Sequence, residues 1–177
     1  MTMTQDIRWK QRFDNFKRAF YLLREMIDAE QDFTSYESIV KEGIIQRFEY
    51  CFELAWKTLK DKMEYDGLTI TRVSPKPLLK QAYQSKYINN IELWLKMAND
   101  RNLMSHTYNF NSFDQVLKNV QQDYYPLLEA LYDGLTEGLL IDESDFPYLC
   151  DLQYLEEIKN PHLLKHIQRI GKVFYRK

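Results

Sequence analysis

The chain has 177 residues, of which 45% are hydrophobic and 15% aromatic, which suits one domain of ordinary size with a packed core and a modest appendage. Its formal net charge of −2 argues against a broadly basic nucleic-acid-binding surface, so any RNA contact is expected to be a local pocket. No uncharged stretch approaches the length of a membrane-spanning helix, and charged residues break any early apolar run; this predicts a soluble, cytoplasmic protein.

The first 65 residues carry two predicted long helices, each with apolar residues at the spacing of one helix face. The first is expected over residues 6–30. The second is expected to be capped by Thr34, Ser35 or Ser38 and to run to about Tyr65, where Asp66-Gly67 stops it. The expected buried residues of the first are Trp9, Phe13, Phe16, Phe20, Leu23 and Ile27. Those of the second are Ile44, Ile45, Phe48, Cys51, Phe52, Ala55, Leu59 and Met63.

Three charged residues, Arg47, Glu49 and Glu53, interrupt the apolar second helix. Glu49 and Glu53 are one turn apart, so both carboxylates can receive Arg47 or a basic group from a neighbouring helix. Charges in such a setting most often form structural ion pairs. The other interpretation is that they line a functional cleft, and the sequence leaves both open.

Short connections join three further predicted helices. A short helix starts at Ser74-Pro75, where the serine caps it and the proline fits its first turn. A longer helix is capped by Asn89 or Asn90 and runs into a polar cluster. The predicted fold is therefore all-α, an up-and-down bundle of four or five helices.

The last bundle helix is predicted from Phe113 to about Tyr132, with a kink at Pro126. Gly134 and Gly138 are expected to end its regular pattern.

The polar cluster lies between residues 99 and 108 and contains the candidate catalytic pair, Arg101 and His106. Arginine presents a permanently charged planar fork to phosphate oxygens, and histidine is the side chain best suited to take a proton near neutral pH. On a straight helix the two splay by roughly 140°, so one copy aims them poorly at a single phosphate. Two copies packed about a two-fold axis would bring two Arg and two His into one cleft.

Three neighbours are candidate supporting residues. Asn102 lies one turn before His106, so its amide can fix the imidazole tautomer, and Asp100 and Ser105 add polar groups beside it. Arg101 and His106 together can drive attack of a ribose 2′-hydroxyl on its own phosphodiester, with no metal required. A structural role, such as a surface ion pair or a capping histidine, explains the same spacing at least as well.

Two blocks of the sequence resemble one known family. Arg101 followed by four residues, His106, one residue and Tyr108 is similar to the motif of the HEPN family, in the branch encoded beside minimal nucleotidyltransferases. Residues 45–61 resemble the signature helix of proteins labelled nucleotidyltransferase substrate-binding. The similarity covers roughly residues 7–135 and implies a HEPN-like up-and-down bundle.

The resemblance implies the toxin of a toxin–antitoxin pair, a metal-independent endoribonuclease that acts on RNA as a homodimer without a cofactor. In it His106 would be the general base, Arg101 would stabilise the transition state and Asn102 would orient the imidazole. Tyr108 would be the hydroxyl on which a cognate minimal nucleotidyltransferase places AMP. Neither DNA nor a membrane is an expected partner. Two other functions stay open: a non-catalytic nucleotidyltransferase substrate-binding subunit, and an inactive decayed fusion.

Residues 139–177 are predicted to form a separate appendage behind a bundle of residues 1–138. It reads as a strand-like segment over residues 146–153 followed by a helix, and it resembles the C-terminal end of a minimal nucleotidyltransferase. In that family the strand aspartate, here Asp151, is a metal ligand. The chain lacks the Gly-Ser turn and the strand-and-turn Asp-x-Asp pair that hold phosphate and Mg²⁺ there. The tail is therefore interpreted as a remnant without catalytic function that folds back onto the bundle.

Overall fold

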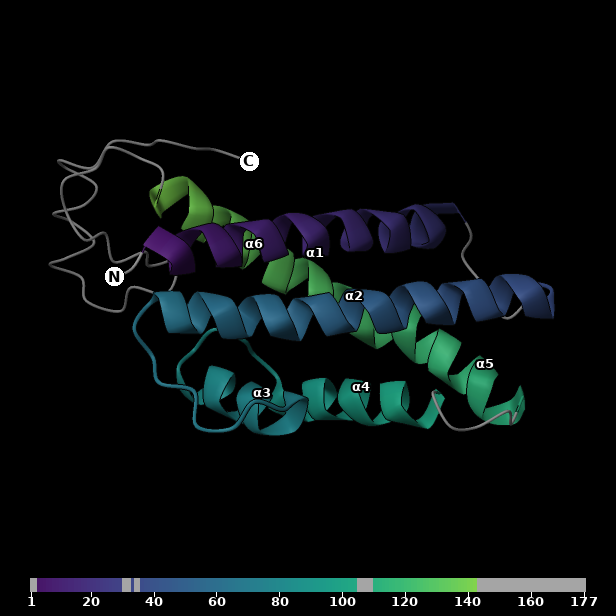
Figure 1. Cartoon of the computed structure of the whole chain (residues 1–177). Helices are drawn as coiled ribbons and strands as arrows, with labels where there is room; N and C mark the ends of the chain where they lie inside the picture. The colour runs from purple at the N-terminus through teal and green to yellow at the C-terminus, as the bar shows by residue number, and fades with distance from the viewer. Residues whose placement is uncertain (1–2, 30–32, 34–35, 105–109, 143–177) are drawn as a thin grey trace, which may run out of the picture. The chain divides into compact units, whose positions relative to one another are not determined.

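The computed structural model describes residues 3–29, 33, 36–104 and 110–142, and the long elements in these ranges are all helical (Figure 1). This confirms the all-α class, while the strand-like segment and the helix predicted for the tail lie outside the described residues. The elements are α1 (Met3–Ala29), α2 (Ser38–Tyr65), α3 (Pro75–Gln84), α4 (Ile91–Met104), α5 (Phe110–Asn119), the π-helical turn η2 (Val120–Tyr124) and α6 (Tyr125–Asp142).

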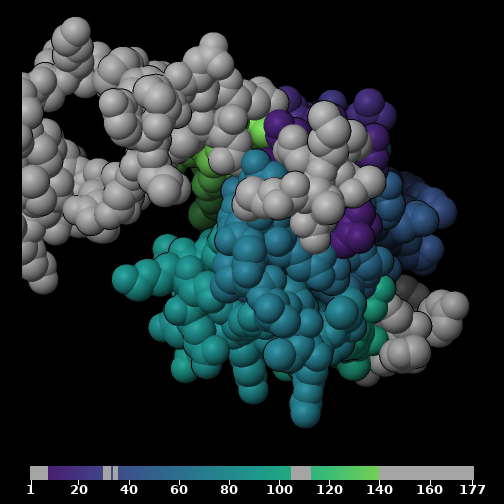
Figure 2. Space-filling model, turned by 60° about the vertical axis from the view of Figure 1, so that its left-hand side comes forward, coloured from purple at the N-terminus to yellow at the C-terminus, as the bar shows by residue number. Residues whose placement is uncertain are grey.

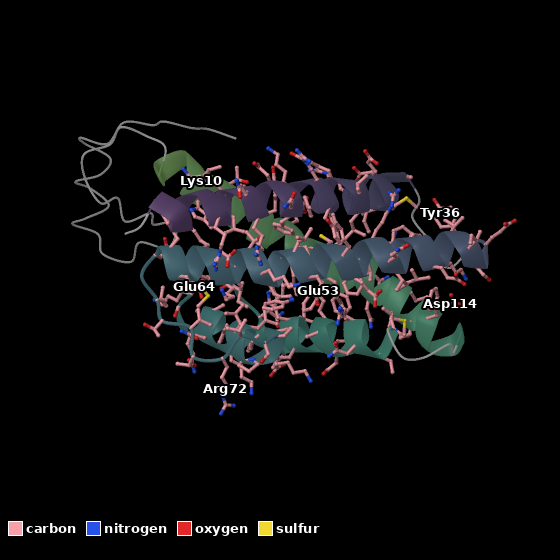
Figure 3. All side chains as sticks on the ribbon, in the orientation of Figure 1. Lys10, Tyr36, Glu53, Glu64, Arg72 and Asp114 are labelled. Atoms are coloured by element: carbon pink, nitrogen blue, oxygen red, sulfur yellow. The ribbon has the colours of Figure 1, made fainter. Side chains whose placement is uncertain are left out.

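The helices run up and down, and α2 lies between α1 on one side and α3 and α4 on the other (Figure 1). Figure 1 shows α1 and α2 antiparallel and side by side, with α3 and α4 along the other side of α2. From the side seen in Figure 2, the teal residues of the α3 and α4 region form the lower surface of the bundle. Side chains fill the space on both sides of α2 in Figure 3, so α2 is the helix around which the core forms.

Both predicted buried faces are confirmed. Every predicted core residue of α1 is buried except Ile27, which is half-buried, and every predicted one of α2 is buried. Aromatic rings join α1 to α6: Phe20 stacks on Tyr125 with 5.5 Å between ring centroids and on Tyr132 with 5.0 Å. The three-and-four spacing is a local signal, and it identified these faces because burial of one apolar stripe dominates helix packing.

An ion cluster also joins α1 to α2. The Asp61 carboxylate, whose side chain is 2% exposed, lies 2.8 Å from an Arg8 nitrogen and 2.9 Å from Arg12 Nε. Lys60 adds a third cation at 3.3 Å. A carboxylate so deeply placed needs several partners to offset its lost hydration, and here α1 supplies two of them.

The last helical stretch differs from the prediction at three points. It begins at Phe110 and not at Phe113, and it continues beyond Tyr132 to Asp142. Directly before Pro126, where a kink was predicted, the chain forms a wide turn in which the Tyr125 amide donates to the Val120 carbonyl five residues back. Proline lacks an amide hydrogen, so the regular helix bonding is already interrupted at this position. A π turn, whose hydrogen bonds span five residues and not four, accommodates the one additional residue in the turn.

Gly134 and Gly138 do not end the helix as predicted, because both lie inside α6. Each glycine costs about 1 kcal/mol of helix propensity. Burial of Leu128, Leu131 and Leu135 on the inner face of α6 outweighs that cost. The helix therefore runs past the predicted boundary at residue 138, and the division into bundle and appendage stays a prediction.

Candidate functional site

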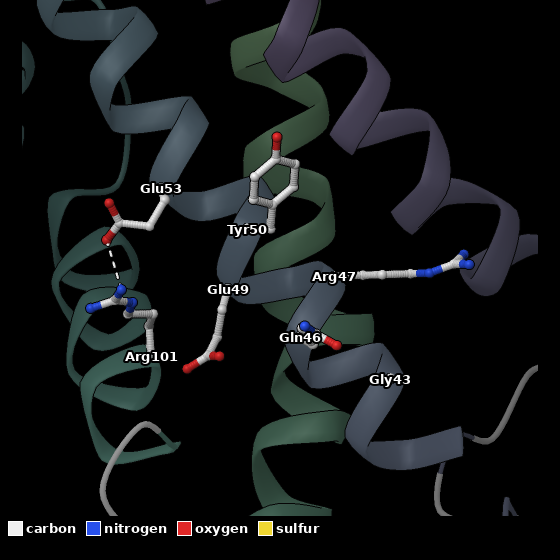
Figure 4. A pocket seen from close by; sticks show the side chains of 7 residues that line it. All are labelled: Gly43, Gln46, Arg47, Glu49, Tyr50, Glu53 and Arg101. Carbon is white, nitrogen blue, oxygen red and sulfur yellow. Dashed lines mark ion pairs between the residues drawn. The ribbon is translucent and has the colours of Figure 1, made fainter. Parts of the chain in front are cut away.

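Arg101 lies in the last turn of α4 and faces α2. Its Nη2 is 3.0 Å from Glu53 Oε1, and its Nη1 donates to Asn102 Oδ1 at 3.1 Å (Figure 4). The Arg101 side chain is 30% exposed, so the guanidinium is held by the protein and still reachable from solvent. The sequence left open whether Glu53 pairs with a neighbouring helix, and Arg101 of α4 is the group it meets.

Glu53 is itself fixed from behind. Its Oε2 accepts a hydrogen bond from the Trp56 indole nitrogen at 3.2 Å and lies 2.9 Å from Lys57 Nζ. The Trp56 side chain is buried, so it cannot move away to release the carboxylate. One oxygen of Glu53 therefore anchors the side chain while the other presents negative charge to Arg101.

The side chains around this pair line an open cleft of about 500 Å³. Seven residues line it: Gly43, Gln46, Arg47, Glu49, Tyr50, Glu53 and Arg101. Six of them come from α2, so its outward face forms one wall, and the end of α4 supplies the other. The cleft is thus lined by two arginines, two glutamates, an amide and an aromatic ring.

The side chains that line the cleft point in different directions in Figure 4. Glu49 points toward Arg101, whereas Arg47 points away from it, toward α1. There the Arg47 Nη1 donates to the Leu22 carbonyl oxygen at 2.9 Å, and not to Glu49 or Glu53 as the sequence suggested. A Cβ added at Gly43 would meet no atom within 4 Å, so the cleft is open at this point of α2.

Asp100, the residue before Arg101, points into the protein. Its Oδ2 accepts hydrogen bonds from Asn119 Nδ2 at 2.9 Å and from the Tyr124 hydroxyl. Gln115 donates in turn to Asn119 Oδ1 at 3.1 Å. This network joins the end of α4 to α5 and the π turn, so it fixes the backbone from which Arg101 extends. Neither Asn119 nor Tyr124 was predicted from the sequence, because both contacts join residues far apart in the chain.

Tyr124→Phe is expected to lower stability at neutral pH by about 1–2 kcal/mol, the usual cost of losing one buried hydrogen bond. Burial, and then the bond to Asp100, raises the pKa of Tyr124 above its ordinary value. An unfolded tyrosine ionises near pH 10, so above that pH the unfolded chain binds fewer protons than the native one, and stability falls. Denaturant midpoints between about pH 8 and 11 should therefore fall less steeply in the variant than in the wild type. Equal slopes would contradict this assignment.

Three predicted site residues, Ser105, His106 and Tyr108, lie outside the described residues. The splay between Arg101 and His106, and the bond from Asn102 to the imidazole, therefore stay predictions. In the described part of the chain, no group of three or more His, Cys, Asp and Glu residues is placed to hold a metal ion. None of the helices described here combines the length and apolarity needed to cross a membrane.

Fold and site together define a class: an all-α, up-and-down bundle with an arginine-containing polar cleft between its second and fourth helices. The sequence pattern of the family described as "Nucleotidyltransferase substrate binding protein like" matches residues 11–137. The chain therefore belongs to this family, and the HEPN/nucleotidyltransferase substrate-binding resemblance found in the sequence is confirmed.

This chain is similar in sequence to known relatives and similar in fold to two solved structures. A protein of Haemophilus influenzae named probable ribonuclease HepT is 30% identical over 100 residues, which cover 51% of this chain and 68% of the relative. A solved structure from Thermus thermophilus is 30% identical with a TM-score of 0.57, and covers 68% of this chain and 98% of its own. Another from Haemophilus influenzae, described as revealing the fold of a substrate binding domain of a nucleotidyltransferase, is 25% identical with a TM-score of 0.61, and covers 70% and 98%.

Proposed function

We propose that this chain is a HEPN-type endoribonuclease that cleaves RNA without a metal and acts as a homodimer. The observation that supports this most directly is Arg101, a guanidinium fixed by Glu53 and exposed at the edge of an open cleft. The relative named probable ribonuclease HepT makes RNA the substrate to test first.

The reaction assigns one task to each side chain. His106 removes the proton from a ribose 2′-hydroxyl, and the freed oxygen attacks the adjacent phosphorus. The bond from phosphorus to the 5′-oxygen breaks, and that oxygen takes a proton from a protonated histidine. The products are a 2′,3′-cyclic phosphate and a 5′-hydroxyl. Arg101 stabilises the extra negative charge that the phosphoryl oxygens carry in the transition state.

Glu53 orients Arg101 in this mechanism. The Arg101 and Glu53 side chains are 30% and 24% exposed, so solvent partly screens their ion pair and a phosphate can share the guanidinium with Glu53. The guanidinium contacts Glu53 through Nη2 and Asn102 through Nη1, and because the side chain is 30% exposed it stays reachable for a phosphate group. Fixing the group in advance lowers the entropy cost of binding the transition state.

The homodimer supplies what one chain lacks. Arg101 and His106 diverge by roughly 140° on a straight helix, so we assign the working site to two copies whose α4 ends meet. A cognate minimal nucleotidyltransferase regulates the site by joining the Tyr108 oxygen to the α-phosphate of ATP and releasing pyrophosphate. AMP on Tyr108 then brings bulk and negative charge beside a cleft that receives phosphate. This pairing makes the protein a toxin and the transferase its antitoxin.

RNA cleavage is expected to continue undiminished in EDTA, because the proposed reaction uses only imidazole and guanidinium groups. The measurement follows a labelled single-stranded RNA on a denaturing gel, with and without chelator. A His106→Ala preparation made in parallel is the control for contaminating ribonucleases. Loss of cleavage in EDTA with rescue by Mg²⁺ or Mn²⁺ would overturn the metal-free mechanism.

A second function, a non-catalytic substrate-binding subunit of a nucleotidyltransferase, is favoured by the charge of the cleft. Two glutamates balance its two arginines, whereas a ribonuclease site is expected to attract phosphate strongly. The solved relative described as a substrate binding domain points the same way. Cleavage by the wild type that is absent in His106→Ala decides for the ribonuclease. Equal behaviour of both, together with binding to the transferase, decides for the subunit.

A further inference from the structure

The segment from Gly67 to Ile91 contains four basic residues and no acidic one. The four are Arg72, Lys76, Lys80 and Lys86. The rest of the chain has 20 basic and 26 acidic residues, so the net charge of −2 is the sum of +4 in this segment and −6 elsewhere. The average over the whole chain conceals a strongly basic stretch.

All four cations are exposed, and none of them forms an ion pair with another residue that the structure describes. Figure 3 shows Arg72 extending away from the bundle on the α3 side, and teal side chains project from the lower edge of the surface in Figure 2. The carboxylates that flank the segment do not neutralise it. Asp66 is engaged by Lys62 at 2.6 Å and by the Tyr87 hydroxyl, and Glu92 lies at the start of α4.

The basic side chains are held on a fixed surface. Leu78, Leu79 and Ala82 bury the inner face of α3, and Gln81 Nε2 donates to the Thr69 carbonyl at 2.9 Å, which ties the preceding loop to the helix. Lys76, Lys80 and Tyr83 are then spaced by four and three residues, along the outer face. Tyr83 is 46% exposed, so an aromatic ring lies among the cations.

Lys86 occupies a backbone position that lysine rarely takes. It follows the end of α3 with φ of +63°, and the Tyr87 amide donates back to the Ala82 carbonyl at 2.9 Å. Glycine is the residue that favours this left-handed position after a helix, and lysine is strained there. A strained residue persists where the surrounding structure or a function requires it, and here it adds a fourth charge to the basic surface.

We infer that the surface formed by Arg72, Lys76, Lys80, Tyr83 and Lys86 binds the backbone of single-stranded RNA, with the Tyr83 ring stacking on a base. Exposed cations on α3 and in the segments directly before and after it, together with the exposed Tyr83 ring, are what a single-stranded polyanion requires. This rests on the proposed function for the identity of the polymer. From Ile91, next to this surface, α4 leads to Arg101 over about 15 Å, so one RNA strand can contact the surface and reach the cleft.

The test measures binding of a fluorescein-labelled single-stranded RNA of roughly 12 nucleotides by anisotropy over a range of salt concentrations. All proteins carry His106→Ala, so that the RNA stays intact. Lys76→Gln/Lys80→Gln is compared with Lys17→Gln/Arg18→Gln, which removes two exposed cations from α1. Glutamine preserves helix propensity in both pairs. The α3 double variant should weaken binding about tenfold and reduce the slope of log K against log salt concentration by about 1.4. The α1 double variant should leave both the affinity and this slope unchanged.

Lys86→Gly separates binding from folding. It should raise the melting temperature, because glycine relieves the strained backbone, and weaken RNA binding about threefold. A residue with a purely structural role would not move these two quantities in opposite directions.

Other results would decide against the inference or against the proposed function. Equal weakening by the α3 and α1 pairs, or no weakening by either, overturns the inference. So does intact RNA binding with loss of binding to a nucleotidyltransferase, which would make the surface a protein interface. If RNA binding depends on the α3 surface but the chain with His106 intact cleaves no RNA, the proposed function fails and this inference stands.

Discussion

Replacing Arg101 with alanine is expected to lower the rate of RNA cleavage by about a hundred- to a thousandfold, the usual cost of losing one donor that stabilises transition-state charge. The fold should persist, since the side chain is 30% exposed and its ion pair with Glu53 contributes at most about 1 kcal/mol. Glu53 keeps the Trp56 indole and Lys57 as partners after the substitution. Single-turnover cleavage with saturating enzyme, together with thermal melting, separates the chemical loss from any loss of fold.

The matched control is Lys96→Ala, which also removes a partly exposed, ion-paired cation from α4. It should leave the rate within about twofold of the wild type, because Lys96 faces Asp123 and does not line the cleft. Glu53→Gln keeps an acceptor for the Trp56 indole but removes the charge that orients Arg101. Its cleavage rate should therefore lie between those of Arg101→Ala and Lys96→Ala. Equal losses in Arg101→Ala and Lys96→Ala would show a general electrostatic effect and remove Arg101 from the mechanism.

Mixing the inactive Arg101→Ala and His106→Ala proteins tests the dimer. A mixed dimer still holds one intact arginine and one intact histidine, on different chains, so part of the activity should return. No recovery, in a mixture whose subunits are shown to exchange, would mean that each chain builds its own site.

The sequence predicts best where the signal is local. The buried faces of α1 and α2 follow from a three-and-four spacing that neighbouring residues alone determine. The end of α2 at Asp66, the start of α3 at Pro75 and the capping bond from Leu93 to Asn90 were likewise predictable from adjacent residues. These features depend on helix chemistry and not on the packing of the whole bundle.

Contacts between distant segments were the ones the sequence did not determine. Arg47 binds the Leu22 carbonyl because α1 lies beside α2, and Asp100 binds Tyr124 because the π turn faces the end of α4. Pro126 signals an irregular helix but not whether that helix bends or widens. Gly134 and Gly138 were misleading, because propensity is a weak signal that burial of an apolar face overrides.

Net charge taken over the whole chain does not show where along the chain the charges lie. It argued for a contact limited to a pocket, yet it averages a basic surface at α3 with an excess of acidic residues elsewhere. Local charge becomes informative only once the structure shows which cations are paired. Arg8 and Arg12 of α1 are engaged by Asp61, whereas the cations around α3 meet no carboxylate among the described residues.

Both the cleft and the α3 surface depend on α2 being held firmly between its neighbours. On the α1 side, Phe20 is fully buried, and its ring stacks nearly parallel to those of Tyr125 and Tyr132. Its loss would remove two of the stacking contacts that join α1 to α6 and leave a cavity that rigid aromatic neighbours cannot close.

Phe20→Ala is therefore expected to lower the free energy of unfolding by about 3–5 kcal/mol, a large part of the roughly 5–15 kcal/mol typical of a domain. Leu22→Ala is the matched control, because this side chain is 44% exposed on the same helix, and it should cost less than about 1 kcal/mol. Urea denaturation followed by far-ultraviolet circular dichroism measures both. Since the change acts on packing and not on the extent of unfolding, the midpoint should fall while the slope stays the same. A loss under about 1 kcal/mol for Phe20→Ala would mean that α6 does not pack on α1 in solution, and that the bundle holds without it.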